Sequence, residues 1–275
     1  MFEDISKILL LTDMDGTLLS KDKSVSPENL AALSRFRKAG GRFSIATGRV
    51  IQATQQYAET LSLDGPSVLC NGCMIYDFGD KTVKWQETLP EDKAKVMIME
   101  LLNRFPQVSA EINTPFTAYV VQCNDISRQH RVIAGMTAVE EVNSIEDVPR
   151  GSWNKVLFAM ESRFVSEFAQ YAKSLQYYDC AEFVTSDAVY HEMLPPHCSK
   201  GDAMRKIVSL YKLDGYTVVA MGDYNNDLRM LELADFAACP STAIPEVKAA
   251  ADMVCKADSS TAVAEVLSYI MDRKD

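Results

Sequence analysis

The chain has 275 residues, 47% hydrophobic and 24% charged, which is the composition of a folded globular protein with room for about two domains. Its 28 basic and 38 acidic residues give a net charge of −10, and this charge disfavours nucleic acid or an anionic membrane as a partner. Because the N-terminus lacks the basic residues of a signal peptide and no apolar run reaches the roughly 18 residues of a membrane span, we expect a cytoplasmic protein.

The first part of the chain alternates predicted strands and helices. A strand over residues 7–12 ends at Asp13, and the following helix begins with Ser26 and Pro27 and stops at Gly40. A second strand, in RFSIATGR, ends at Thr47, a polar helix follows, and PSVLCNG is predicted as a third strand. This alternation indicates a parallel sheet with helices on its faces.

The pattern changes in the middle of the chain. Three strand-like and two helix-like stretches are predicted there, at residues 117–122, 155–160 and 182–186 and at residues 91–105 and 162–176. We interpret residues 85–189 as an inserted α+β domain.

The strand and helix alternation returns late in the chain. A helix over residues 200–211 leads to a strand that ends at Asp223, and further apolar strands follow in FAACP and ADMVC. Apolar strands of this kind are typical of a sheet covered on both faces. The sequence therefore predicts an α/β core made of residues 1–84 and 190–275.

Acidic side chains follow two of the predicted core strands. Asp13 and Asp15 point to the same side of an extended chain, and Gly16 allows a sharp turn after them. The segment GDYNND brings Asp223 and Asp227 to the same edge of the sheet, where ligands bind in parallel sheets. Crowded carboxylates favour a bound cation, and a set of oxygen ligands suits Mg²⁺.

Other residues at these strand and helix ends fit a phosphate group. Thr47 and Gly48 offer a hydroxyl and backbone N–H groups at the start of a helix, where anions are favoured. Lys200 begins another predicted helix and supplies a positive charge for phosphate oxygens. A carboxylate nucleophile, a hydroxyl, a lysine and Mg²⁺ together indicate phosphoryl transfer through an aspartyl-phosphate.

Four motifs occur in a fixed order along the chain, namely DMDGTLL, ATGR, the lysine of SKGDAM and GDYNNDLRML. With them the sequence resembles the haloacid dehalogenase superfamily, and within it the Cof-like phosphatases, over nearly the whole chain. The resemblance implies a Rossmann-like parallel-sheet core with an inserted α+β cap domain, and it identifies residues 85–189 as the cap.

The resemblance also implies roles for individual residues. Asp13 is then the nucleophile, and Asp15 is the general acid and base. Thr47, Gly48 and Lys200 hold the phosphoryl group. Asp13, Asp15 through its backbone carbonyl, and Asp223 bind Mg²⁺, while Asn226 and Asp227 complete the metal and phosphate shell.

The predicted function is a Mg²⁺-dependent phosphatase that hydrolyses small phosphorylated metabolites, such as sugar phosphates or cofactor phosphates. A phosphomutase of the same superfamily is an alternative, and it would need a bisphosphate activator. A phospho-aspartate signalling module is another, although such modules carry no insertion of about a hundred residues. The sequence does not indicate the oligomeric state.

Two further groups of residues leave alternatives open. Cys70 and Cys73 have the spacing of a redox or metal site, but a zinc site needs more ligands, so packing or turn roles are favoured. His130, between Arg128 and Arg131, fits either a basic patch for an anionic substrate or a solvated helix face, and the second is favoured.

Overall fold

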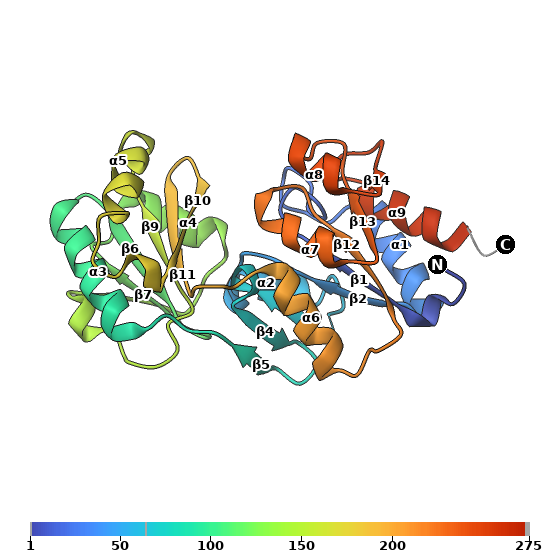
Figure 1. Cartoon of the computed structure of the whole chain (residues 1–275), viewed down its shortest axis with the longest axis horizontal. Helices are drawn as coiled ribbons and strands as arrows, with labels where there is room; N and C mark the ends of the chain where they lie inside the picture. The colour runs from blue at the N-terminus through green and yellow to red at the C-terminus, as the bar shows by residue number, and fades with distance from the viewer. Residues whose placement is uncertain (1, 64, 273–275) are drawn as a thin grey trace. The chain divides into compact units, whose positions relative to one another are not determined.

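The computed structural model describes residues 2–63 and 65–272 and divides into two compact units (Figure 1). The core unit comprises the chain up to Gly48, Leu61–Lys84 and the chain from Ser199 onward. The inserted unit comprises Arg49–Thr60 and Trp85–Cys198. Each unit has its own sheet.

The core unit is built on a five-stranded sheet in the order β14-β13-β12-β1-β2, and every pair in it is parallel. The strands are β1 (Ile8–Thr12), β2 (Arg42–Ile45), β12 (Thr217–Met221), β13 (Phe236–Cys239) and β14 (Met253–Val254). All residues of β1 and β13 are buried, as expected for strands covered on both faces.

Helices cover both faces of this sheet. They are α1 (Pro27–Lys38), α6 (Lys200–Leu210), α7 (Leu228–Leu233), α8 (Pro245–Ala250) and α9 (Ala262–Asp272). Helix α1 packs against α9, and α6 packs against α7 (Figure 1). Since β1 to β2 and β12 to β13 run in opposite directions across the sheet, right-handed crossovers place α1 and α7 on opposite faces. No helix within the described ranges is long and apolar enough to cross a membrane.

The predicted third strand belongs to a small separate sheet of three strands. They are β3 (Pro66–Leu69), β4 (Met74–Asp77) and β5 (Thr82–Gln86), with β3 and β4 antiparallel. A single parallel bridge between Ala46 and Val68 joins β3 to the end of β2. The strand was predicted from its apolar residues, but its hairpin with β4 was not.

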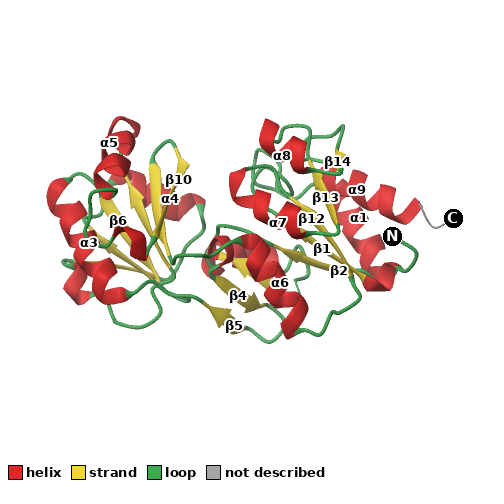
Figure 2. Cartoon of the chain, in the orientation of Figure 1, coloured by secondary structure: helices red, strands yellow, loops and turns green. Residues whose placement is uncertain are grey.

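The inserted unit has a six-stranded sheet in the order β10-β11-β9-β6-β7-β8, which is antiparallel except for the pair β7 and β8. Its strands are β6 (Ser109–Asn113), β7 (Ala118–Val121), β8 (Val139–Val142), β9 (Lys155–Ala159), β10 (Glu182–Asp187) and β11 (Tyr190–Leu194). Its helices are α2 (Ile51–Ala58), α3 (Glu91–Arg104), α4 (Asp125–Ile133) and α5 (Ser162–Ala172). Figure 2 shows α3, α4 and α5 around these strands.

The boundaries of the inserted unit differ from the predicted range of 85–189. Strand β11 pairs with both β9 and β10, so residues 190–198 lie in the inserted unit. Helix α2, expected in the core, also groups with the inserted unit. The strand β11 was not recognised because buried polar residues, His191 and Glu192, interrupt its apolar pattern.

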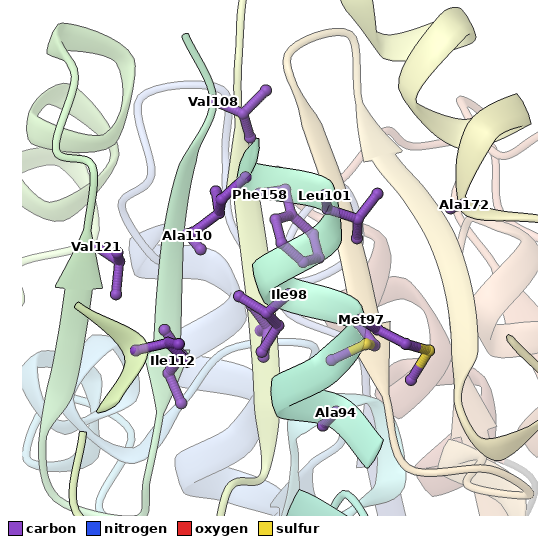
Figure 3. Packing of buried hydrophobic residues seen from close by; sticks show 14 of the residues in the cluster. Ala94, Met97, Ile98, Leu101, Val108, Ala110, Ile112, Val121, Phe158 and Ala172 are labelled. Carbon is purple, nitrogen blue, oxygen red and sulfur yellow. The ribbon is translucent and has the colours of Figure 1, made fainter. Parts of the chain in front are cut away.

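The inserted unit has its own apolar core between the sheet and the helices. Met97, Ile98 and Leu101 of α3 belong to the same buried cluster as Ile112 of β6 and Phe158 of β9 (Figure 3). All five side chains are buried. An independent core of this size explains why the insertion forms a unit of its own.

One buried histidine in this core makes stability depend on pH. His191 is 4% exposed, contacts the Phe168 and Phe183 rings, and has its Nδ1 atom 2.9 Å from the Thr185 hydroxyl. Burial lowers the pKa of His191 to about 4, although Glu192 opposes the change.

We expect His191 to lower the free energy of unfolding as the pH falls. Between pH 6.5 and pH 4 the unfolded chain binds a proton that the folded chain does not, so folding loses roughly 3 kcal/mol across this interval. His191→Phe removes this titration and keeps an aromatic ring. Urea unfolding at pH 7 and pH 4.5 measures the free energy of unfolding of wild type and of His191→Phe. If both proteins lost the same free energy between the two pH values, His191 would not be the titrating group.

Candidate active site

Three predicted site residues lie where adjacent core strands end. Asp13 directly follows β1, Thr47 follows β2, and Asp223 follows β12. The parallel ladder continues past β1, because the Asp13 N–H donates to the Met221 carbonyl at 2.8 Å. The topology therefore brings residues distant in sequence to one edge of the sheet.

Lys200 lies between two carboxylates. Its Nζ atom is 2.6 Å from Asp13 Oδ1 and 2.6 Å from Asp227 Oδ1, and all three side chains are buried. Lys200 is the first residue of α6, and the Ser199 side chain caps that helix by accepting from the Asp202 N–H. Capping fixes the start of α6, and this position of the helix directs the lysine to the two aspartates.

The charges of this cluster strongly perturb one another. Burial raises the pKa of Asp13 well above its ordinary value, Lys200 opposes this, and Asp227 adds to it. Burial alone would lower the pKa of Lys200, but the Asp13 and Asp227 carboxylates raise it above its ordinary value. The lysine is therefore protonated at neutral pH, in contact with carboxylates that carry excess negative charge.

Asp223 adds a third carboxylate next to this cluster. Its Oδ1 atom accepts from the Thr17 hydroxyl at 2.7 Å, and burial raises its pKa to about 6, opposed by Thr17 and aided by Asp227. Gly16 has φ +88°, and a Cβ there would lie 2.4 Å from Asp223 Oδ2. Only glycine fits both the backbone conformation and the space at this turn.

The three carboxylates lie close enough together to hold one metal ion. One ligand oxygen from each of Asp13, Asp223 and Asp227 lies within 4.8 Å of the others. Lys200 alone does not balance three negative charges. Burial is the main cause of the raised pKa values of Asp13 and Asp223, and the nearby Asp227 carboxylate adds to it. A set of carboxylate oxygens suits a hard cation such as Mg²⁺.

Asp15 lies in a different environment from the other aspartates. Its carboxylate forms an ion pair with Lys23 at 2.8 Å, and its side chain is 39% exposed. Lys23 has φ +66° and lies in a tight turn closed by the Ser20 N–H and the Ser24 carbonyl. Lys23 was not predicted as a site residue, because no local sequence pattern indicates that this turn folds back on Asp15.

Thr47, Gly48 and Asn226 surround a residue that was also missed. Thr47 is buried, and its carbonyl accepts from the Asn71 N–H at 3.0 Å. Asn226 Nδ2 donates to Asn71 Oδ1 at 3.0 Å, and a Cβ on Gly48 would lie 2.8 Å from the same oxygen. The Asn-Gly dipeptide in CNGC is a turn signal that could have directed attention to Asn71.

The sequence left alternative roles open for the Cys70 and Cys73 pair and for His130. Cys70 and Cys73 are both buried, and within the described ranges no third metal-ligating side chain joins them. Burial of both side chains is the feature that a packing role requires. His130 Nδ1 is 3.0 Å from Glu111 Oε2, so His130 packs on the sheet of the inserted unit instead of lying on a solvated face.

Several curated proteins are similar to this chain over almost its full length. It is 27% identical to the pyridoxal phosphate phosphatase YbhA of Escherichia coli, covering 94% of this chain and 97% of that protein. It is 25% identical to the 5-amino-6-(5-phospho-D-ribitylamino)uracil phosphatase YwtE of Bacillus subtilis, covering 94% and 96%.

Solved structures share the fold. The TM0651 protein of Thermotoga maritima has a TM-score of 0.84 at 23% identity, covering 95% of this chain and 96% of that one. A haloacid dehalogenase-like hydrolase of Bacteroides thetaiotaomicron has a TM-score of 0.83 at 23% identity, covering 95% and 98%. The predicted fold class, a parallel α/β core with an inserted α+β domain, is confirmed.

The family model for haloacid dehalogenase-like hydrolases matches residues 10–267. This match confirms the resemblance to the haloacid dehalogenase superfamily that the four motifs predicted. The prediction of a hydrolase is also confirmed, since the similar proteins include named phosphatases. By this match over most of its length, the chain belongs to the haloacid dehalogenase-like hydrolases.

Proposed function

We propose that this chain is a Mg²⁺-dependent phosphatase that hydrolyses small phosphorylated metabolites through a phosphoryl group carried by Asp13. The observation that carries the proposal is the buried Lys200, which contacts both Asp13 and Asp227 at 2.6 Å beside the end of β1. In such a pair the carboxylate supplies the nucleophile, and the lysine supplies a positive charge for the phosphate oxygens.

In the first step, a carboxylate oxygen of Asp13 attacks phosphorus and the bond from phosphorus to the leaving oxygen breaks. Asp15, which takes up a proton on leaving Lys23, gives this proton to that oxygen, so the leaving group departs as a neutral alcohol. The Lys200 ammonium, the Thr47 hydroxyl and the Gly48 backbone N–H stabilise the negative charge on the phosphoryl oxygens.

In the second step, water replaces Asp13 on phosphorus. Asp15, now ionised, accepts a proton from the attacking water, the bond from Asp13 to phosphorus breaks, and inorganic phosphate leaves with Asp13 regenerated. Asp15 has to turn from Lys23 toward the reacting atoms in this scheme. The exposure of the Asp15 and Lys23 side chains, 39% and 50%, makes the pair weak enough for that movement.

The proposed metal ligands are Asp13, Asp223 and Asp227, together with the backbone carbonyl of Asp15. When bound, Mg²⁺ would neutralise part of the charge on these carboxylates and on the phosphoryl oxygens. Asp227 Oδ2 also accepts from the Asp223 and Tyr224 N–H groups, which fixes the orientation of its carboxylate. Asn226 is proposed to complete the phosphate shell.

The substrate class is inferred from the relatives. The Escherichia coli relative is a pyridoxal phosphate phosphatase, and the Bacillus subtilis relative is a 5-amino-6-(5-phospho-D-ribitylamino)uracil phosphatase. Both substrates are small phosphate esters. We also propose that the inserted unit is the cap that selects the leaving group, and that the core unit, with its segments up to Gly48, Leu61–Lys84 and from Ser199 onward, carries the chemistry.

Phosphate release from a panel of esters tests the proposed function. The panel contains p-nitrophenyl phosphate, hexose phosphates, pyridoxal phosphate and a mononucleotide, each with Mg²⁺ and with EDTA. We expect release with Mg²⁺ and almost none with EDTA, because the carboxylate cluster needs a cation. Phosphopeptides serve as the control for large substrates and should be poor.

Two outcomes of this assay would contradict the proposal. Equal release with Mg²⁺ and EDTA would remove the metal from the mechanism. No release from any ester by folded protein would exclude a general phosphatase of small metabolites, and isomer formation with a bisphosphate activator would instead indicate a mutase.

A further inference from the structure

A cavity lies in the core unit, at the end of the sheet opposite to Asp13 and Thr47. Its volume is about 350 Å³. Leu9 and Arg42, which line it, stand near the amino ends of β1 and β2, whereas the proposed catalytic residues follow the carboxyl ends. The cavity is therefore not part of the site described above.

The walls of this cavity are largely apolar. Leu9, Phe43, Ile207 and Leu213 line it, and all four side chains are buried. A volume of about 350 Å³ falls at the lower end of the range for small-molecule pockets, which is about 300–1,000 Å³. The cavity suits a ligand with one ring or a short aliphatic body.

Two arginines line the same cavity. The Arg42 guanidinium lies 5.4 Å from the centre of the Tyr216 ring, and Arg42 forms no ion pair with any residue that the structure describes. The Arg37 guanidinium lies 5.3 Å from the Phe43 ring and donates to the Leu61 carbonyl at 2.6 Å. Stacking holds both planar groups in place, and in a chain of net charge −10 such a pair favours an anion.

A buried carboxylate, that of Asp77, also lines the cavity and restricts the charge of a ligand there. Asp77, which is 7% exposed, accepts from the Gly79 N–H at 2.8 Å and from the Tyr211 hydroxyl. Asp77 ends β4 and pairs with Pro66 of β3, and the Pro66 carbonyl accepts from the Ser44 hydroxyl of β2. By strand spacing, Asp77 lies about 10 Å from Ser44. Its negative charge disfavours a second anionic group at that end of the ligand.

We propose that this cavity binds a small organic anion with one charged head and a flat apolar body, such as an aromatic carboxylate. Arg37 and Arg42 contact the head, and the body lies among Leu9, Ile207 and Leu213. The proposal is independent of the proposed function, because none of these residues belongs to the phosphoryl site.

The experiment is a titration of the full chain with 4-fluorobenzoate, followed by ¹⁹F NMR of the ligand. We expect saturable binding, and we expect Arg42→Gln to weaken it about tenfold or more, since a charge-assisted hydrogen bond is lost. Arg35→Gln is the matched control, because Arg35 is an exposed arginine on α1 that does not line the cavity. Arg42→Gln should release phosphate at the wild-type rate.

The uncharged analogue 4-fluorobenzamide separates charge recognition from simple filling of an apolar space. It should bind at least tenfold more weakly than 4-fluorobenzoate to the wild-type chain. Absence of 4-fluorobenzoate binding, equal affinity for Arg42→Gln and wild type, or equal affinity for the amide and the carboxylate would each overturn the proposal.

Discussion

Asp13→Asn is expected to reduce phosphate release by at least about four orders of magnitude, because it removes the proposed nucleophile and not an auxiliary group. The amide of asparagine cannot form the acyl-phosphate, while its shape preserves the packing beside Lys200. Initial rates with p-nitrophenyl phosphate and Mg²⁺ measure the loss. Activity within about tenfold of wild type would show that Asp13 is not the nucleophile.

Asp15→Asn gives the matched comparison. General acid and base catalysis commonly contributes about 10²–10⁴ in rate, so this variant should retain more activity than Asp13→Asn. Nitrophenolate leaves without a proton, so phosphorylation of Asp13 should continue while its hydrolysis slows. We therefore expect a burst of one nitrophenolate for each Asp15→Asn chain and a phosphorylated chain by mass spectrometry. A phosphorylated residue other than Asp13 would contradict the assigned roles.

The parts of the fold that were predicted correctly are those with a local signal. Asp13 stands one residue, and Thr47 and Asp223 two residues, beyond the last residue of an apolar strand, and the topology of a parallel sheet brings such positions together. The start of α1 was also predicted correctly, because Ser followed by Pro is a local signal for a helix start. In the structure the Ser26 side chain accepts from the Asn29 N–H, and Pro27 is the first residue of the helix.

The parts that were not predicted depend on tertiary contacts. Strand β6 carries Glu111, which is fully buried and lies next to His130 of α4, and a buried glutamate disrupts the alternation that identifies a strand. The pair of Asp15 and Lys23 requires a turn with Lys23 at φ +66°. Propensity does not predict a lysine in that conformation.

The role of Lys200 was predicted from the sequence, but its burial and its contacts were not. Its place at the start of a predicted helix identified Lys200 as a phosphate-binding charge. The sequence did not indicate that it is fully buried and bridges Asp13 and Asp227, since this depends on how α6 packs on the sheet.

Lys200→Met should therefore destabilise the metal-free chain as well as abolish turnover. The substitution keeps an unbranched side chain of similar length but leaves the Asp13 and Asp227 carboxylates buried without their cation. Breaking a buried ion pair in this way costs about 3–5 kcal/mol. Urea unfolding in EDTA measures the loss, and Lys206→Met, an exposed lysine on the same helix, should stay within about 0.5 kcal/mol of wild type.

Two conditions should reduce the destabilisation of Lys200→Met if it arises from charge. Bound Mg²⁺ would replace part of the lost positive charge, so the difference from wild type should shrink at saturating Mg²⁺. Lower pH should act in the same direction, because the pKa of Asp13 is already raised by burial and protonation removes the unpaired charge. A loss that is equal in EDTA and Mg²⁺ and constant from pH 8 to pH 5 would instead assign Lys200 to packing.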